Sequence, residues 1–191
     1  MSARPLCVEP EPVLRRAARP VLRFTAELRR LARDLIDTMY ASDGIGLAAP
    51  QIGCDVQVFV ANPTQQPGRE LVAVNPVVLP LGGRAAIQEG CLSLPDVWDR
   101  VVRAARVRLR GQDLDGRAFS LEAEGLLAII LQHEADHLHG CLFIDRLSWF
   151  RRRRALARLR GAAGARQGRL APKRPEQEAD ILTAAPDAAT C

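Results

Sequence analysis

The chain has 191 residues, of which 48% are hydrophobic, so it is long enough to bury one sizeable core and too short to suggest two. It contains no run of 18 apolar residues, which excludes a membrane-spanning helix. Residues 1–150 hold 17 arginines and 18 acidic residues, so this part of the chain is nearly neutral and is not expected to bind nucleic acid in general. The net charge of +5 comes from residues 151–191, which hold 10 basic and four acidic residues.

The first 24 residues are rich in proline and arginine and are predicted to be extended, with one short helical turn. A helix is predicted from Thr25, a suitable N-cap, to Tyr40. Its apolar side chains recur at helical spacing, at Leu28, Leu31, Ala32, Leu35 and Met39. Residues 44–53 hold too much Gly and Pro for a helix and too many apolar residues for a solvated loop. They are expected to form a buried or cleft-lining loop.

Strands are predicted next, at residues 55–60, 71–75, 106–110 and 117–122. The third of these alternates arginine with Val107 and Leu109, as a half-buried strand does, and Asp115-Gly116 is predicted to turn the chain back.

Residues 125–138 predict a helix that is apolar on every side at its start and therefore lies in the core, with Gly140 as a stop. A basic helix is predicted from Arg151 to Arg160, following a single catalytic domain at residues 1–150. Residues 161–191 contain few large apolar side chains and are expected to be disordered.

The five cysteines, an odd number without a CxxC pair, predict no disulfide framework; they are Cys7, Cys54, Cys91, Cys141 and Cys191. The opening residues lack the apolar stretch of a secretory signal, and a cytoplasmic location is expected. Each cysteine is then a small buried residue, a nucleophile or a metal ligand.

All three histidines fall within seven residues, at His133, His137 and His139. On a helix, His133 and His137 lie one turn apart and can hold one cation, while Glu134 lies about 100° around the axis, near enough to reach a water on that cation. The pattern predicts a metal-dependent hydrolase with Glu134 as general acid and base. His139 faces elsewhere and is expected to be exposed. A merely solvated helical face is the alternative, disfavoured by the apolar residues that precede it.

The third metal ligand has to come from elsewhere in the chain. Phe143 stands where the HExxHxxGxxH proteases carry a third histidine, and the only later glutamates, Glu176 and Glu178, belong to the predicted disordered tail. Asp145 is possible but lies just past the helix end. Cys91 is the better candidate, because one thiolate and two imidazoles leave a position open for water, as in catalytic sites.

Three segments together resemble the peptide deformylase family: GIGLAAPQ at residues 44–51, EGCLS at 89–93 and HEADH at 133–137. The resemblance implies an α+β fold, with mixed or antiparallel sheets packed around a central metal-binding helix. It implies removal of the formyl group from the N-formylmethionine of nascent polypeptides, with release of formate. It also implies Fe²⁺ as the natural ion, with Ni²⁺, Co²⁺ or Zn²⁺ able to replace it; the ligands alone suit zinc as well or better.

The resemblance further implies roles for single residues. Gln51 and the backbone N–H of Leu92 would stabilise the oxyanion, and Gly46 would offer backbone groups to the peptide. The methionine pocket would be lined by Ile45, Leu126, Ile129 and Ile130. Three of them have a plainer alternative: Gln51 could serve only to satisfy backbone groups of its own loop, and Leu126 and Ile129 could be ordinary core residues. Glu89 is expected to pair with Arg103 and support the Cys91 segment.

The chain departs from the family pattern at Trp98-Asp99, where many members carry a basic residue, and at Val102, where a proline is common. In relatives a basic C-terminal helix docks on the ribosome, and the helix from Arg151 to Arg160 is expected to do the same, unless it is only a solvated charged helix. Two other functions stay open: a metallopeptidase or amidase of different specificity, and a binding protein with a structural metal. Glu134 argues against the second.

Overall fold

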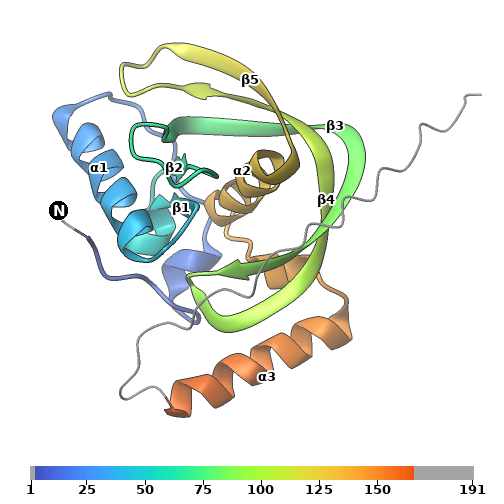
Figure 1. Cartoon of the computed structure of the whole chain (residues 1–191). Coiled ribbons are helices and arrows are strands. Elements are labelled where there is room, and N and C mark those ends of the chain that lie inside the picture. Colours follow the sequence, from blue (N-terminus) through green and yellow to red (C-terminus); the bar gives the residue numbers. More distant parts are fainter. Residues whose placement is uncertain (1–2, 166–191) are drawn as a thin grey trace, which may run out of the picture.

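One five-stranded sheet forms the frame of the computed structural model, which describes residues 3–165. Its strands are β1 (Gly46–Ala48), β2 (Val58–Ala61), β3 (Leu71–Cys91), β4 (Leu94–Gln112) and β5 (Ala118–Glu124). They lie in chain order, and every neighbouring pair is antiparallel. Together with three α-helices this makes an α+β fold, and the long strands curve around the helix α2 (Figure 1).

The central hairpin of β3 and β4 is much longer than the short strands predicted at residues 71–75 and 106–110. The prediction was wrong because Pro76, Pro80 and Gly82 interrupt the pattern of the segment. In the sheet, the register shifts between Val74 and Val77 and again between Pro80 and Gly82. Such irregularities accommodate residues that cannot donate to the ladder, so the strand continues through them.

The segment at residues 44–53, predicted to be a loop, instead contains β1 and the 3-10 helix η2 (Ala49–Ile52). It is buried as expected, since Leu47, Ala48 and Ala49 have no exposed surface. Pairing with β2 satisfies its backbone in the core, which a loop of apolar residues would not do.

The helix α1 (Ala26–Ala41) begins after its N-cap Thr25, as predicted, and follows the short helical turn η1 (Pro12–Arg15). Its buried Leu28, Leu35 and Met39 pack against residues of β1 and β2. The helix α2 (Gly125–Leu138) has the predicted bounds and packs against the strands, with Ala128 and Leu131 in the core.

The end of α2 is fixed by Gly140, which has a φ of +71°. A Cβ at this position would lie 2.7 Å from the backbone carbon of Arg15, so only glycine lets the N-terminal segment pack there. The 3-10 helix η3 (Phe143–Arg146) follows and places Phe143 and Ile144 in the core.

The helix α3 (Trp149–Ala165) begins two residues before and ends five after the predicted basic helix. Its buried Ala155 and Leu159 pack on Val97, Val101 and Phe143. The prediction of disorder from residue 161 was wrong for residues 161–165, which continue the helix α3, and the rest of the predicted tail, from residue 166 onward, lies outside the described residues. Among the described helices, none combines the length and the apolar character needed to cross a bilayer.

Candidate metal centre

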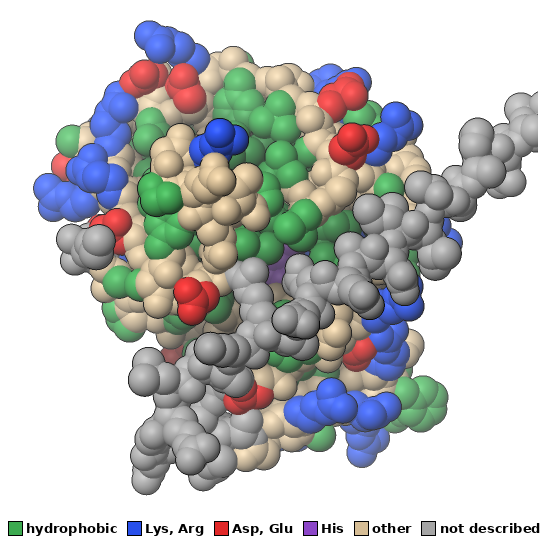
Figure 2. Space-filling view, in the orientation of Figure 1, with side chains coloured by type: hydrophobic (Ala, Val, Ile, Leu, Met, Phe, Trp, Pro, Cys, Tyr) green, Lys and Arg blue, Asp and Glu red, His purple; other side chains and the backbone are tan. Residues whose placement is uncertain are grey.

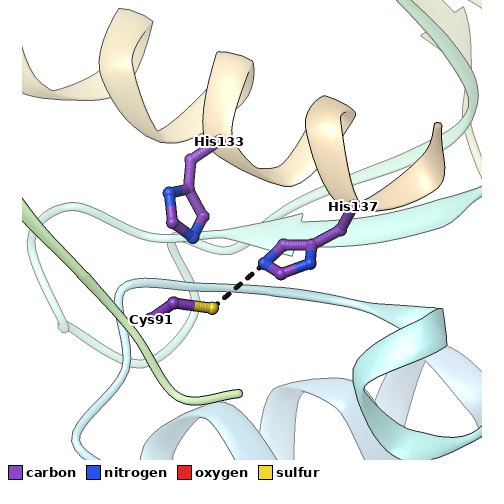
Figure 3. Close-up of side chains that lie close together, drawn as sticks. All are labelled: Cys91, His133 and His137. Carbon is purple, nitrogen blue, oxygen red and sulfur yellow. Dashed lines mark hydrogen bonds between the residues drawn. The ribbon is translucent and has the colours of Figure 1, made fainter. Parts of the chain in front are cut away.

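A thiol and two imidazoles meet where the end of β3 faces α2. The ligand atoms of Cys91, His133 and His137 all lie within 4.8 Å of one another, and Cys91 Sγ is 3.2 Å from His137 Nε2. Figure 3 shows both rings projecting from the same side of the helix toward the cysteine. Cys91 is the last residue of β3, before a two-residue turn, so a tight hairpin end carries the thiol to the helix.

These three side chains fit a metal ion by geometry and by chemistry. Bonds of the length found for Zn²⁺ put the ligand atoms of a tetrahedral site roughly 3.4 Å apart, close to the 3.2 Å between Cys91 Sγ and His137 Nε2. Burial lowers the pKa of His137 well below its usual value, which keeps the imidazole neutral, as a ligand must be. A thiolate and two imidazoles suit borderline divalent metals and leave further positions open.

His133 is oriented by contacts on two sides. Its Nδ1 lies 2.9 Å from Glu89 Oε2, and its ring stacks on Phe143 at a centroid distance of 6.3 Å. Because an ionised carboxylate only accepts hydrogen bonds, Nδ1 carries the hydrogen and Nε2 is left to bind a metal. Although burial alone would lower the pKa of His133, its contacts with Cys91 and Glu89 raise it well above the usual value, so a metal ion that binds at Nε2 must displace a proton.

A buried ion-pair chain continues from Glu89. Arg103 donates hydrogen bonds to both oxygens of Glu89, at 2.6 and 2.8 Å, and a third hydrogen bond to Asp136 at 2.9 Å. Asp136 also accepts two hydrogen bonds from Arg146. Although burial alone would raise the pKa of Glu89, its hydrogen bonds with His133 and Arg103 lower it to about 2.

The Glu89–Arg103 pair is the one expected from the sequence, but the sequence reasoning missed Asp136 and Arg146. A signal for Asp136 existed, because a carboxylate on such an apolar helix must find a partner. Nothing local indicated that the partners would be Arg103 on β4 and Arg146 on η3.

Glu134 lies in the same region, only 3% exposed, beside Gly46 of β1. A Cβ on Gly46 would be 2.4 Å from Glu134 Oε1 and 2.8 Å from Ile130 Cγ2, so the strand can approach only because it lacks a side chain there. Burial raises the pKa of Glu134 to about 7. Within the described residues, Glu134 Oε2 has no hydrogen-bond partner, so this oxygen is available to a proton.

Gln51 reaches the cysteine from η2. Its Nε2 donates to Ser93 Oγ at 3.3 Å and lies 3.6 Å from Cys91 Sγ, while its Oε1 accepts from the backbone N–H of Ala48. The side chain therefore anchors its own segment and also directs an amide N–H₂ toward the centre. Leu92 follows Cys91 directly in the turn.

The residues predicted to line an apolar pocket differ in exposure. Ile45 packs in the same hydrophobic cluster as Ile130, next to Gly46. Ile129 is buried, whereas Leu126 is 37% exposed at the start of α2. His139 is exposed, as predicted. Figure 2 shows a histidine side chain at the bottom of a recess bordered by hydrophobic side chains, and His133 keeps 12% of its side-chain surface exposed.

Comparison with known proteins finds similarity along most of the chain. Residues 3–153 match the sequence pattern of the polypeptide deformylase family. A peptide deformylase of Acidobacterium capsulatum is 45% identical over 84% of this chain and 95% of that protein, and one of Alkalilimnicola ehrlichii is 44% identical over 89% and 95%. The crystal structure of a peptide deformylase from Legionella pneumophila superposes with a TM-score of 0.82 at 40% identity, covering 87% of this chain and 99% of that one.

Proposed function

Because this chain belongs to the polypeptide deformylase family, we propose that Cys91, His133 and His137 hold one divalent metal ion for its reaction. The reaction is that of the family: the chain is a hydrolase that removes the N-terminal formyl group from polypeptides and releases formate. The observation that carries the proposal is the meeting of the three ligand atoms beside a buried carboxylate on the same helix. In this proposal α2 is the central metal-binding helix, and catalysis belongs to residues 1–150.

We propose Fe²⁺ as the working ion, with Ni²⁺, Co²⁺ or Zn²⁺ able to take its place. The donor atoms alone suit zinc equally well, so iron rests on the family resemblance. When bound, the ion supplies Lewis acidity that lowers the pKa of water and polarises the formyl carbonyl.

Glu134 is assigned the proton transfers. Its Oε2 would accept a proton from the attacking water and then deliver that proton to the departing amine. Burial supports this role, because a carboxyl with a pKa of about 7 can both accept and release a proton near neutral pH. A structural metal site would have no use for a buried carboxylate with one oxygen unengaged among the described residues.

Gln51 and the backbone N–H of Leu92 are assigned to the oxyanion. The Gln51 amide already points its N–H₂ group toward Cys91 and Ser93, and its carbonyl is held by Ala48, which fixes the orientation in advance. Glu89 and Arg103 support the centre through the Nδ1 of His133.

The formyl-methionyl end of a nascent polypeptide is the proposed substrate, met in the cytoplasm. Gly46 would offer its backbone to the peptide next to Glu134. The methionine side chain would lie against Ile45, Leu126, Ile129 and Ile130. Of these, Leu126 has the most exposed surface to offer, and Ile129 contributes more to the core.

The basic helix α3 is the proposed ribosome-docking element, and its arginines divide into two groups. Arg151 pairs with Asp99 and Arg152 with Asp145, so these two hold the helix to the domain. The exposed Arg153, Arg154, Arg158 and Arg160 are then the ones that would meet RNA phosphates. Basic side chains gather over this helix in Figure 2.

The proposal is tested by formate release from a formyl-Met tripeptide, using protein purified without oxygen. Glu134→Ala is expected to bind metal normally and to lose activity, whereas Cys91→Ala is expected to lose metal as well. Glu122→Ala, which removes an exposed carboxylate on β5, is the matched control and should keep wild-type activity. Full activity in Glu134→Ala, or a full complement of metal in Cys91→Ala, would contradict the assigned roles.

A further inference from the structure

The guanidinium of Arg103 is the junction between two carboxylates that come from different elements. Glu89 on β3 takes two of its hydrogen bonds, and Asp136 on α2 takes the third. The side chain of Arg103 is only 4% exposed, so water does not substitute for these partners. A guanidinium is planar and its N–H directions are fixed, so the contact with Asp136 also sets the direction of the fork that holds Glu89.

Asp136 is itself clamped from the far side. Arg146 on η3 donates Nη2 to Oδ1 at 2.5 Å and Nε to Oδ2 at 3.2 Å. The side chain of Asp136 is 10% exposed and that of Arg146 is 52% exposed, so the chain of contacts runs from the surface to the buried pair. Asp136 is thus held between two arginines.

Asp136 precedes His137 on α2, but its side chain lies outside the cluster of metal ligands. It lines a cavity of about 520 Å³ together with Arg103, Arg146 and Gln132, and that lining does not include His133 or His137. The hydrogen-bonded route from Asp136 to the centre runs through Arg103 and Glu89 to Nδ1 of His133.

We propose that Asp136, held by Arg146, is a positioning residue: it orients Arg103 so that Glu89 fixes the His133 ring with Nε2 toward the metal ion. This rests on the proposed function, since it takes His133 as a metal ligand. Without the carboxylate charge of Asp136, the contact that orients Arg103 weakens to a hydrogen bond with a neutral oxygen, and the guanidinium is freer to tilt. Glu89 would then hold His133 less firmly, and the ion would leave more readily.

The test compares metal loss from the Co²⁺-loaded protein, followed by the cobalt absorption bands after a chelator is added. Asp136→Asn keeps the shape and removes the charge, and it is expected to release Co²⁺ about 10- to 100-fold faster, the range found when contacts behind metal ligands are removed. Its cobalt spectrum should also shift, because the geometry of the histidine ligand changes. A role in folding alone would lower thermal stability without moving these bands.

Asp34→Asn is the matched control, because Asp34 is a buried helical carboxylate paired with an arginine, Arg4, on another part of the fold. It should release Co²⁺ at the wild-type rate. Arg146→Ala and Arg146→Lys change the exposed member of this series of side-chain contacts, so both variants should fold even if Asp136→Asn does not. Metal release is expected to be faster in Arg146→Ala than in wild type, with Arg146→Lys between the two.

Four results would count against the inference. Wild-type release rates in Asp136→Asn would overturn it, as would equal acceleration in Asp34→Asn. If Asp136→Asn does not fold, wild-type rates in Arg146→Ala would overturn it instead. A wild-type protein that binds no Co²⁺ at one ion per chain would overturn the proposed metal centre itself, and the inference with it.

Discussion

Gly46 and Glu134 pack so closely that a Cβ on Gly46 would lie only 2.4 Å from the carboxylate oxygen Oε1 of Glu134. Gly46→Ala must therefore displace Glu134 or β1. We expect kcat/KM to fall by roughly 100-fold, the cost of moving a reacting group by about 1 Å.

Formate release and metal content would be measured for Gly46→Ala beside Gly161→Ala. A Cβ at Gly161 meets nothing within 4 Å, and alanine favours the helix there, so this control should be fully active. Wild-type kcat/KM in Gly46→Ala would show that the close approach does not position Glu134.

Gln51→Glu separates the two contacts of the Gln51 side chain. The new carboxylate still accepts from the N–H of Ala48 but has no N–H₂ to donate. If the amide stabilises the oxyanion, kcat should fall by about 100- to 1,000-fold while metal content is kept. Thermal unfolding of the metal-loaded protein would check that the segment still folds; substantial activity in this variant would leave Gln51 with only its anchoring role.

Oxygen sensitivity is expected to depend on Cys91 and on the ion. Fe²⁺-loaded protein should lose activity in air, because a ferrous ion with a thiolate ligand is readily oxidised. Protein loaded with Zn²⁺ should be stable in air but less active. Cys54→Ala removes a thiol outside the centre and should leave the rate of inactivation unchanged. A zinc-loaded protein that is both fully active and stable in air would argue against iron as the working ion.

Ribosome binding should depend on the solvent-facing arginines of α3. Changing Arg153, Arg154, Arg158 and Arg160 together to alanine is expected to weaken co-sedimentation with ribosomes and to flatten its dependence on salt. Formate release from a free tripeptide should not change. Arg108→Ala on β4 is a control of the same charge type. Equal binding after truncation at Phe150 would exclude this helix as the docking element.

The sequence predicted elements well where the signal was local. The bounds of α2 follow from a continuous apolar run and a glycine stop, and α1 follows from its helical spacing and its N-cap. The sequence did not predict the full lengths of β3 and β4, which have 21 and 19 residues. The strands continue through prolines and glycines that local rules interpret as breaks, because the two strands pair along their length. Tertiary hydrogen bonding, which no local window contains, decided those strands.

The candidate site divides in the same way. His133, Glu134 and His137 follow from spacing on one helix, and Cys91 is the better of the two remaining candidates for the third ligand, the other being Asp145. Asp136 and Arg146 could not be predicted as partners, because Arg103, which links Asp136 to Glu89, lies 33 residues away along the chain. Charge complementarity indicates that a buried carboxylate needs a cation, but not which cation.

β3 pairs with β4 without interruption from Arg84 to Gly90, and this pairing restricts where residues can be inserted into the sequence. Successive side chains of a strand point to opposite faces, so the direction of the Cys91 thiol depends on the parity of the residue count before it. One residue inserted there would turn the thiol away from α2, and two would restore its face. The turn at residues 62–70 carries no such constraint, so insertions that accumulate as the sequence diverges should collect in that turn and be excluded from the hairpin end.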